Sequence, residues 1–142
     1  MNAPHHERQL LLRNSRAEVD AAIEALAELW VELGLEPDVE ADLNIAVEEM
    51  LTNVVRHGKV SGDGEAIRVK VDVSPVEARI EIEDRGEPFN PTEYPPPNIH
   101  ATLEERKPGG LGIMMVRKMM DETRYERRDG WNCFVMVRRL VR

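Results

Sequence analysis

Two neighbouring segments alternate strictly between apolar and polar residues, and this alternation constrains the fold more than any other feature. The apolar positions are Ile67, Val69, Val71 and Val73 in the first segment, and Ala78, Ile80 and Ile82 in the second. A period of two residues is typical of strands that bury one face of a sheet. Pro75 interrupts the pattern between the segments, so we expect two neighbouring antiparallel strands, the second ending at Asp84.

Helical patterns precede these strands. A short apolar segment over residues 8–13 predicts an opening strand. Ser15 with Glu18 forms a capping box, and apolar residues then recur at helical spacing until Gly34. A second helix is predicted to begin at Pro37 and to end at Gly58.

The C-terminal part predicts a third helix beginning at Leu111 and a hairpin. Its strands, residues 123–128 and 132–140, flank the turn Asp129-Gly130. Strands and helices do not alternate, so the order β-α-α-β-β-α-β-β favours an α+β fold. We expect a two-layer α/β sandwich with a mostly antiparallel, mixed sheet and helices on one face. A length of 142 residues suits one domain over residues 1–142.

Residues 90–108 follow neither the two-residue period of a strand nor the spacing of a helix. Prolines at positions 91, 95, 96 and 97 disfavour both helix and ladder. A structureless segment of this length in a small domain is usually functional or disordered. We interpret it as a lid.

Charge and composition exclude several classes of function. The net charge of −8 argues against nucleic acid as a direct partner. No apolar run is long enough for a membrane span, and the N-terminus lacks the apolar core of a secretion signal. We therefore expect a cytoplasmic protein. The single cysteine, Cys133, is expected to be a buried thiol.

Glu49 and Asn53 lie one helical turn apart on the second predicted helix. Asp42 and Arg56 are expected to flank the same cleft. Magnesium prefers oxygen ligands and keeps several waters, so the Asn53 carbonyl with phosphate oxygens would suffice as its site. Glu49 would then be free to act as general base in phosphoryl transfer. The alternative is that both residues are ordinary surface polar groups of a helix.

Asp84 and Gly86 predict the base-binding end of a nucleotide pocket. An acceptor-only carboxylate facing an exocyclic amino group selects adenine over guanine. Gly86 would let the backbone turn beneath a planar base. A turn-forming Asp-x-Gly without a ligand is the alternative.

The glycine-rich segment Gly109-Gly110-Leu111-Gly112 predicts the phosphate-binding end. It would let the backbone approach phosphates at the start of a helix, or it is a flexible hinge. Lys107 either neutralises phosphate charge or lies at a solvated lid edge. His57 either caps the cleft or ends its helix. The predicted ligands are therefore ATP and Mg²⁺.

Three motifs follow one another along the chain: Glu49-x-x-x-Asn53, Asp84-x-Gly86 and Gly110-x-Gly112. In this order they resemble the motifs of the GHKL ATPase superfamily with its Bergerat nucleotide fold. The resemblance covers nearly the whole chain. The run Ala46-Val47-Glu48-Glu49, then Thr52-Asn53 and His57-Gly58, is most similar to the anti-sigma factor serine kinases. It implies Asn53 as magnesium ligand, Glu49 as catalytic base, Asp84 at adenine, and Gly86, Gly110 and Gly112 lining the nucleotide. Cys133 stands where related chains commonly place a threonine that supports Asp84.

The resemblance also implies partners. Anti-sigma kinases bind a sigma factor and use ATP to phosphorylate a serine on an anti-anti-sigma partner, which is a STAS-like protein. Two alternatives are a non-catalytic, nucleotide-responsive switch and a detached ATPase domain of a histidine kinase.

A homodimer through the opening strand and first helix is expected, because an uncovered edge strand invites pairing.

Overall fold

The computed structural model describes residues 5–57, 66–93 and 110–141. The elements are β1 (His6–Leu12), α1 (Arg16–Glu32), α2 (Pro37–His57), β2 (Ile67–Val73), β3 (Glu77–Asp84), a 3-10 helix η1 (Pro91–Glu93), α3 (Gly110–Met119), β4 (Glu122–Arg128) and β5 (Trp131–Arg139). The predicted order of helices and strands is confirmed.

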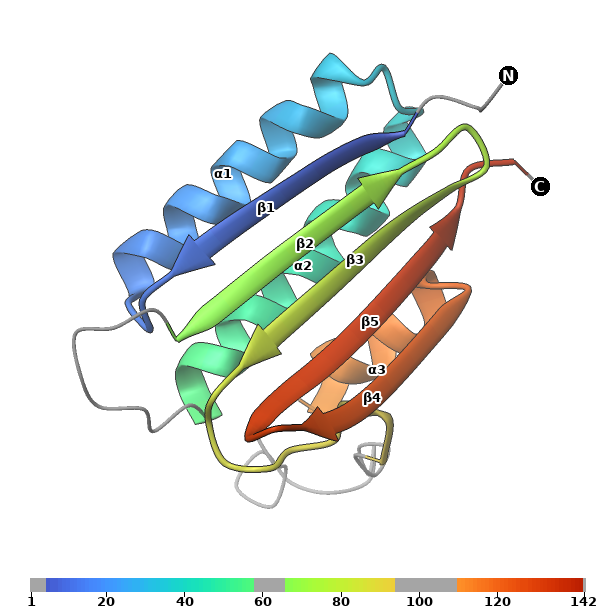
Figure 1. Ribbon diagram of the computed structural model, residues 1–142. Helices are drawn as coiled ribbons and strands as arrows, with labels where there is room; N and C mark the ends of the chain where they lie inside the picture. Colours follow the sequence, from blue (N-terminus) through green and yellow to red (C-terminus); the bar gives the residue numbers. More distant parts are fainter. Residues whose placement is uncertain (1–4, 58–65, 94–109, 142) are drawn as a thin grey trace.

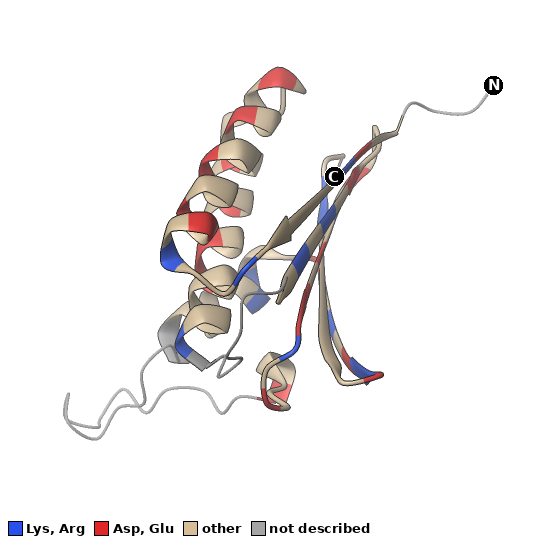
Figure 2. Cartoon of the chain, turned by 60° about the vertical axis from the view of Figure 1, so that its left-hand side comes forward, with Lys and Arg blue, Asp and Glu red and all other residues tan. Residues whose placement is uncertain are grey.

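The five strands form one sheet in the order β1-β2-β3-β5-β4, and each neighbouring pair is antiparallel. All three α-helices lie against one face of this sheet (Figure 1). The side view in Figure 2 shows the resulting two layers. The predicted α+β sandwich is therefore confirmed, with described strand pairings that are antiparallel throughout.

The alternating strands place their apolar residues against the helices. Ile67, Val69, Ile80 and Ile82 are at most 2% exposed and pack with Trp30 of α1 and Leu43 and Leu51 of α2. Charged side chains occupy the intervening positions and pair across the opposite face. Lys70 lies 2.7 Å from Glu83, and Arg128 lies 3.2 Å from Glu81. One face of the sheet is thus core, and the other carries these ion pairs together with the buried Cys133, Val135 and Val137 of β5.

Two local predictions need correction. Ser15 caps the helix as predicted, because its hydroxyl accepts the Glu18 N–H at 3.4 Å. The other half of the predicted capping box differs: the Glu18 carboxylate accepts from the Arg13 N–H, at 3.0 Å, where a capping box would use the Ser15 N–H. The predicted lid also begins with an ordered 3-10 turn. The Asn90 side chain accepts the Thr92 N–H at 2.9 Å and so caps this turn, while a proline suits its first position. Residues 94–108 of the predicted lid lie outside the described residues.

In the described part of the chain, no helix has both the length and the apolar character that crossing a membrane requires.

Candidate functional site

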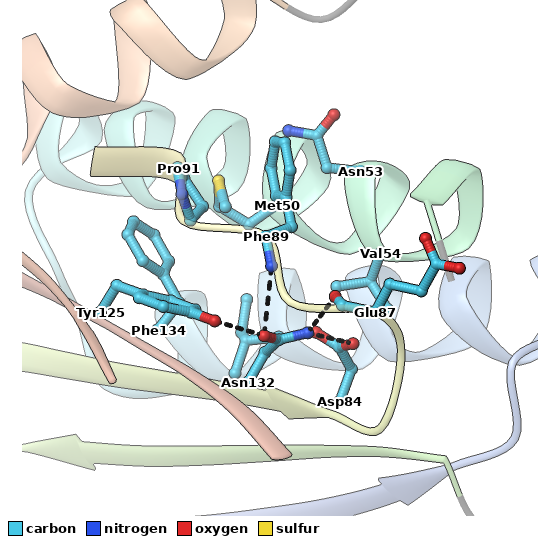
Figure 3. Close-up of a pocket in the computed structure, with 11 residues that line it drawn as sticks. Met50, Asn53, Val54, Asp84, Glu87, Phe89, Pro91, Tyr125, Asn132 and Phe134 are labelled. Carbon is cyan, nitrogen blue, oxygen red and sulfur yellow. Dashed lines mark hydrogen bonds between the residues drawn. The ribbon is translucent and has the colours of Figure 1, made fainter. Parts of the chain in front are cut away.

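A cavity lies between α2 and the ends of the central strands. Its lining comes from α2, from β3 and the segment after it, and from the β4–β5 hairpin (Figure 3). The lining residues are Met50, Asn53, Val54, Ile82, Asp84, Glu87, Phe89, Pro91, Tyr125, Asn132 and Phe134. Asn53, predicted as the magnesium ligand, and Asp84, predicted at the base-binding end, therefore line one cavity.

Asp84 is the last residue of β3, and its carboxylate shapes the turn that follows. The Gly86 N–H donates to Oδ1 at 2.8 Å, and Asn132 Nδ2 donates to the same oxygen at 3.0 Å. Among the described residues, both of these bonds use Oδ1, which leaves Oδ2 able to accept from a ligand. Burial raises the pKa of the Asp84 carboxyl, and these hydrogen bonds and the charge of Arg127 oppose the rise.

Gly86 is buried in this turn, but it is not among the described residues with positive φ. The turn therefore depends on the Asp84 side chain accepting the Gly86 N–H rather than on a left-handed glycine. The Gly86 carbonyl accepts from Arg127 Nη1 at 2.8 Å. Arg127 thus ties the turn to β4.

Asn132 is the residue that sequence reasoning missed. It is 5% exposed, and register places it opposite Asp84. Its Nδ2 donates to Asp84 and to the Glu87 carbonyl, at 3.0 and 2.9 Å. Its Oδ1 accepts from the Tyr125 hydroxyl, from Arg127 Nη1 at 3.1 Å and from the Phe89 N–H at 3.4 Å. Both amide hydrogens and both lone-pair regions are therefore used (Figure 3).

Cys133 does not support Asp84. It is buried, as predicted, but it pairs with Glu83 in the register, and its Sγ lies 3.9 Å from the Trp131 carbonyl. Successive residues of a strand point to opposite faces. Asn132 therefore takes the supporting position on the cavity side, and the residue expected there from the resemblance faces away.

Asn132→Ala is expected to lower the free energy of unfolding by about 2–4 kcal/mol, because it leaves several half-buried donors and acceptors without partners. Urea unfolding measures this loss. Tyr125→Phe is the matched control, since it removes one of the same hydrogen bonds and should cost about 1 kcal/mol. Equal losses in the two variants would contradict the central position given to Asn132.

Asn53 forms the other end of the cavity. It is 2% exposed, and its Oδ1 accepts from Arg56 Nη1 at 3.3 Å. Its Nδ2 is buried and has no partner among the described residues. An unpaired buried amide is costly, so a group that completes its hydrogen bonding would be stabilised here. The surface-residue alternative is wrong for Asn53.

Glu49 is half-buried and lies against α3. A Cβ placed on Gly112 would fall 2.9 Å from Glu49 Oε1 and closer still to Oε2 and Cδ. The carboxylate therefore fills the space beside Gly112, next to the first turn of α3. Glu49 is thus beside the cavity rather than among its lining residues.

The remaining predicted site residues have different positions. Asp42 does not face the cleft, because it pairs with the buried Arg138 at 3.0 Å. That ion pair fastens the N-terminal half of α2 to β5. Gly110 and Leu111 form the first turn of α3, and His57 ends α2. Lys107 and Gly109 lie outside the described residues.

The cavity is narrow. The space left for water-sized molecules is about 30 Å³, whereas small-molecule sites usually measure about 300–1,000 Å³. Figure 3 shows Phe89 and Pro91 between α2 and the aromatic rings of Tyr125 and Phe134. Phe89, which precedes the predicted lid, and Pro91 at its start therefore narrow the cleft, and a larger ligand would have to displace these side chains.

The comparisons with known proteins agree on one family. The model of the family described as "Histidine kinase-like ATPase domain" matches residues 12–138. Serine/threonine-protein kinase BtrW of Bordetella bronchiseptica is 33% identical over 90 residues, 63% of each chain. Serine-protein kinase RsbW of Bacillus pumilus is 34% identical over 95 residues, 63% of this chain and 59% of that protein. The chain thus spans less than two thirds of either relative.

Two further similarities cover more of the chain. Anti-sigma F factor of a Thermoanaerobacter species is 28% identical over 109 residues, 75% of this chain and 76% of that protein. A crystal structure of the RsbU and RsbW domains of a Mycobacterium tuberculosis protein superposes with a TM-score of 0.70. It covers 95% of this chain and 32% of that one, at 19% identity. At that identity the structural match supports the fold.

Proposed function

The chain belongs to the histidine kinase-like ATPase family, and from this premise we propose that it is an ATP-dependent protein serine/threonine kinase. Its proposed substrate is an anti-anti-sigma, STAS-like protein, and it also sequesters a sigma factor. The observation that carries the proposal is the pair on α2, where the buried amide of Asn53 faces the cavity of Asp84 and the Glu49 carboxylate lies one turn away.

The residues of the cavity suit a magnesium–adenine nucleotide complex. Asp84 Oδ2 would accept from the adenine amino group, while Asn132 and Gly86 hold Oδ1. The Asn53 carbonyl would contribute one oxygen to magnesium. The described residues contain no group of three or more His, Cys, Asp or Glu placed to hold a metal, so the other ligands would be phosphate oxygens and waters.

Glu49 would accept the proton of the attacking serine hydroxyl. Bound ATP with magnesium supplies the phosphoryl group and much of the charge compensation. Arg56, which already donates to Asn53 Oδ1, would hold that oxygen in place and add positive charge near the phosphates. Gly110 and Leu111, in the first turn of α3, would bring the N-terminus of that helix toward the triphosphate.

Transfer of labelled γ-phosphate from ATP to purified STAS-domain proteins of the same organism tests this function. A labelled serine on one of them is the expected result. ATP binding without labelling of any would instead favour the nucleotide-responsive switch. Binding of a sigma factor remains a prediction. So does a homodimer through β1, which is an edge strand of the sheet.

Phe89→Ala is expected to tighten ATP binding by roughly 3- to 10-fold, because the side chain that narrows the cavity no longer has to be displaced. Isothermal titration with Mg·ATP measures the change. Val76→Ala is a suitable control, since Val76 is 58% exposed and immediately precedes β3, at the end of the strand opposite to Asp84. Weaker binding in Phe89→Ala would mean that the ring packs against the nucleotide instead.

A further inference from the structure

We infer that Gly112 positions the Glu49 carboxylate by leaving free the volume that any other residue's Cβ would occupy. The inference rests on the proposed function of Glu49 as the base. It assigns Gly112 a role different from that of lining the nucleotide phosphates. Gly112 is on this account a positioning residue that acts through Glu49.

The position of the carboxylate is the first argument. All three atoms nearest to a Cβ added at Gly112 belong to Glu49: Oε1 at 2.9 Å, with Oε2 and Cδ closer. Real Cβ atoms essentially never make contacts under 3.0 Å, so a side chain at position 112 would displace something. What it meets is the far end of a flexible side chain. The carboxylate would therefore move, and the two helices would not need to.

The second argument is that the backbone of α3 gives no other reason for glycine. Gly112 lies in the helix Gly110–Met119 and is not among the described residues with positive φ. A glycine in a helix costs about 1 kcal/mol relative to alanine. Burial of Ile113 and Val116 fixes the rotation of α3 about its axis, and this rotation turns Gly112 toward Glu49 on α2.

Three variants test the inference: Gly112→Ala, Glu49→Asp and the double variant. Gly112→Ala should keep the affinity for Mg·ATP within about twofold and lower transfer to the labelled STAS-domain protein roughly 10- to 100-fold, because a base displaced by about 1 Å loses that much. Its melting temperature should not fall, since alanine favours the helix. In the double variant the shorter carboxylate fits beside the new methyl group, so transfer should exceed that of Gly112→Ala.

A readout without turnover separates this inference from the proposed function. The carbon-13 shift of the Glu49 carboxyl, assigned with Glu49→Gln, should change in Gly112→Ala. It should stay unchanged in Met115→Ala, a control at an exposed position of the same helix. This measurement can be made even if the wild-type chain transfers no phosphate. A lack of transfer by the wild type would count against the kinase function alone.

Three results would overturn the inference. An unchanged carboxyl shift in Gly112→Ala would show that the carboxylate does not occupy this space. Loss of ATP affinity in parallel with transfer would show that Gly112 serves the phosphates. A double variant no faster than Gly112→Ala would show that a shorter acid does not relieve the displacement.

Discussion

Glu49→Gln is expected to keep the affinity for Mg·ATP within about twofold and to lower phosphoryl transfer by roughly 10²- to 10⁴-fold, the usual contribution of a general base. Glutamine keeps the size of the side chain and its fit beside Gly112, but it cannot take up a proton at neutral pH. Glu49 is half-buried and lies outside the cavity lining, so nucleotide binding should not depend on its charge. Equilibrium titration and single-turnover transfer measure the two quantities.

Glu48→Gln is the matched control for this experiment. Glu48 is the neighbouring residue of α2 and is exposed, and the same change of charge there should leave both quantities near the wild-type values. If Glu49→Gln weakened ATP binding as much as transfer, Glu49 would be supporting the pocket. Retained transfer in Glu49→Gln would favour a mechanism in which positioning and charge compensation suffice.

Asp84→Asn is expected to weaken ATP binding by about 1–3 kcal/mol, or roughly 5- to 150-fold, the cost of a mismatched buried polar partner. An amide at this position can still accept from Asn132 and Gly86 through its oxygen. Its NH₂ group would then face the adenine amino group, donor against donor. Titration with ATP and ADP measures the loss, and unchanged affinity would contradict adenine binding at this end of the cavity.

The pH dependence of stability provides a second check on the same variant. Because burial raises the pKa of Asp84 in the folded protein, its carboxyl stabilises the fold below the unfolded pKa of about 3.9. This contribution is lost as the pH rises through the higher, folded pKa. Asp84→Asn does not titrate, so its stability relative to the wild type should improve from about pH 4 upward. Urea unfolding at several pH values would show this; a parallel pH dependence in both proteins would contradict it.

The sequence alone determined the elements and the fold class. The alternation of apolar residues in β2 and β3 predicts which face of each strand is buried, and the apolar spacing in α1 and α2 does the same for the helices. The buried residues of the structure lie on those faces. Local chemistry also marked several ends, such as the Ser15 cap and the positive φ of Gly34. These predictions held because each depends on residues a few positions apart in the chain.

The two halves of the candidate site could be predicted for a similar reason. Glu49 and Asn53 are one turn apart on one helix, so their proximity is a local property. Asp84 was placed at the end of a strand by its own alternating pattern. That Asn53 and Asp84 would share one nucleotide pocket was inferred from the chemistry of the two side chains and agreed with the resemblance, and the structure places both in the lining of one cavity.

Only the tertiary structure decided which residues support these groups. Asn132 meets Asp84 through the register between β3 and β5, forty-eight positions apart, and a shift of one residue would have put Cys133 there. Asp42 pairs with Arg138 on β5 and does not face the cleft. Gly112 lies beside Glu49 because α3 packs on α2. Each of these contacts joins distant parts of the chain, so its geometry is fixed by how strands and helices pack and is not written in any local pattern.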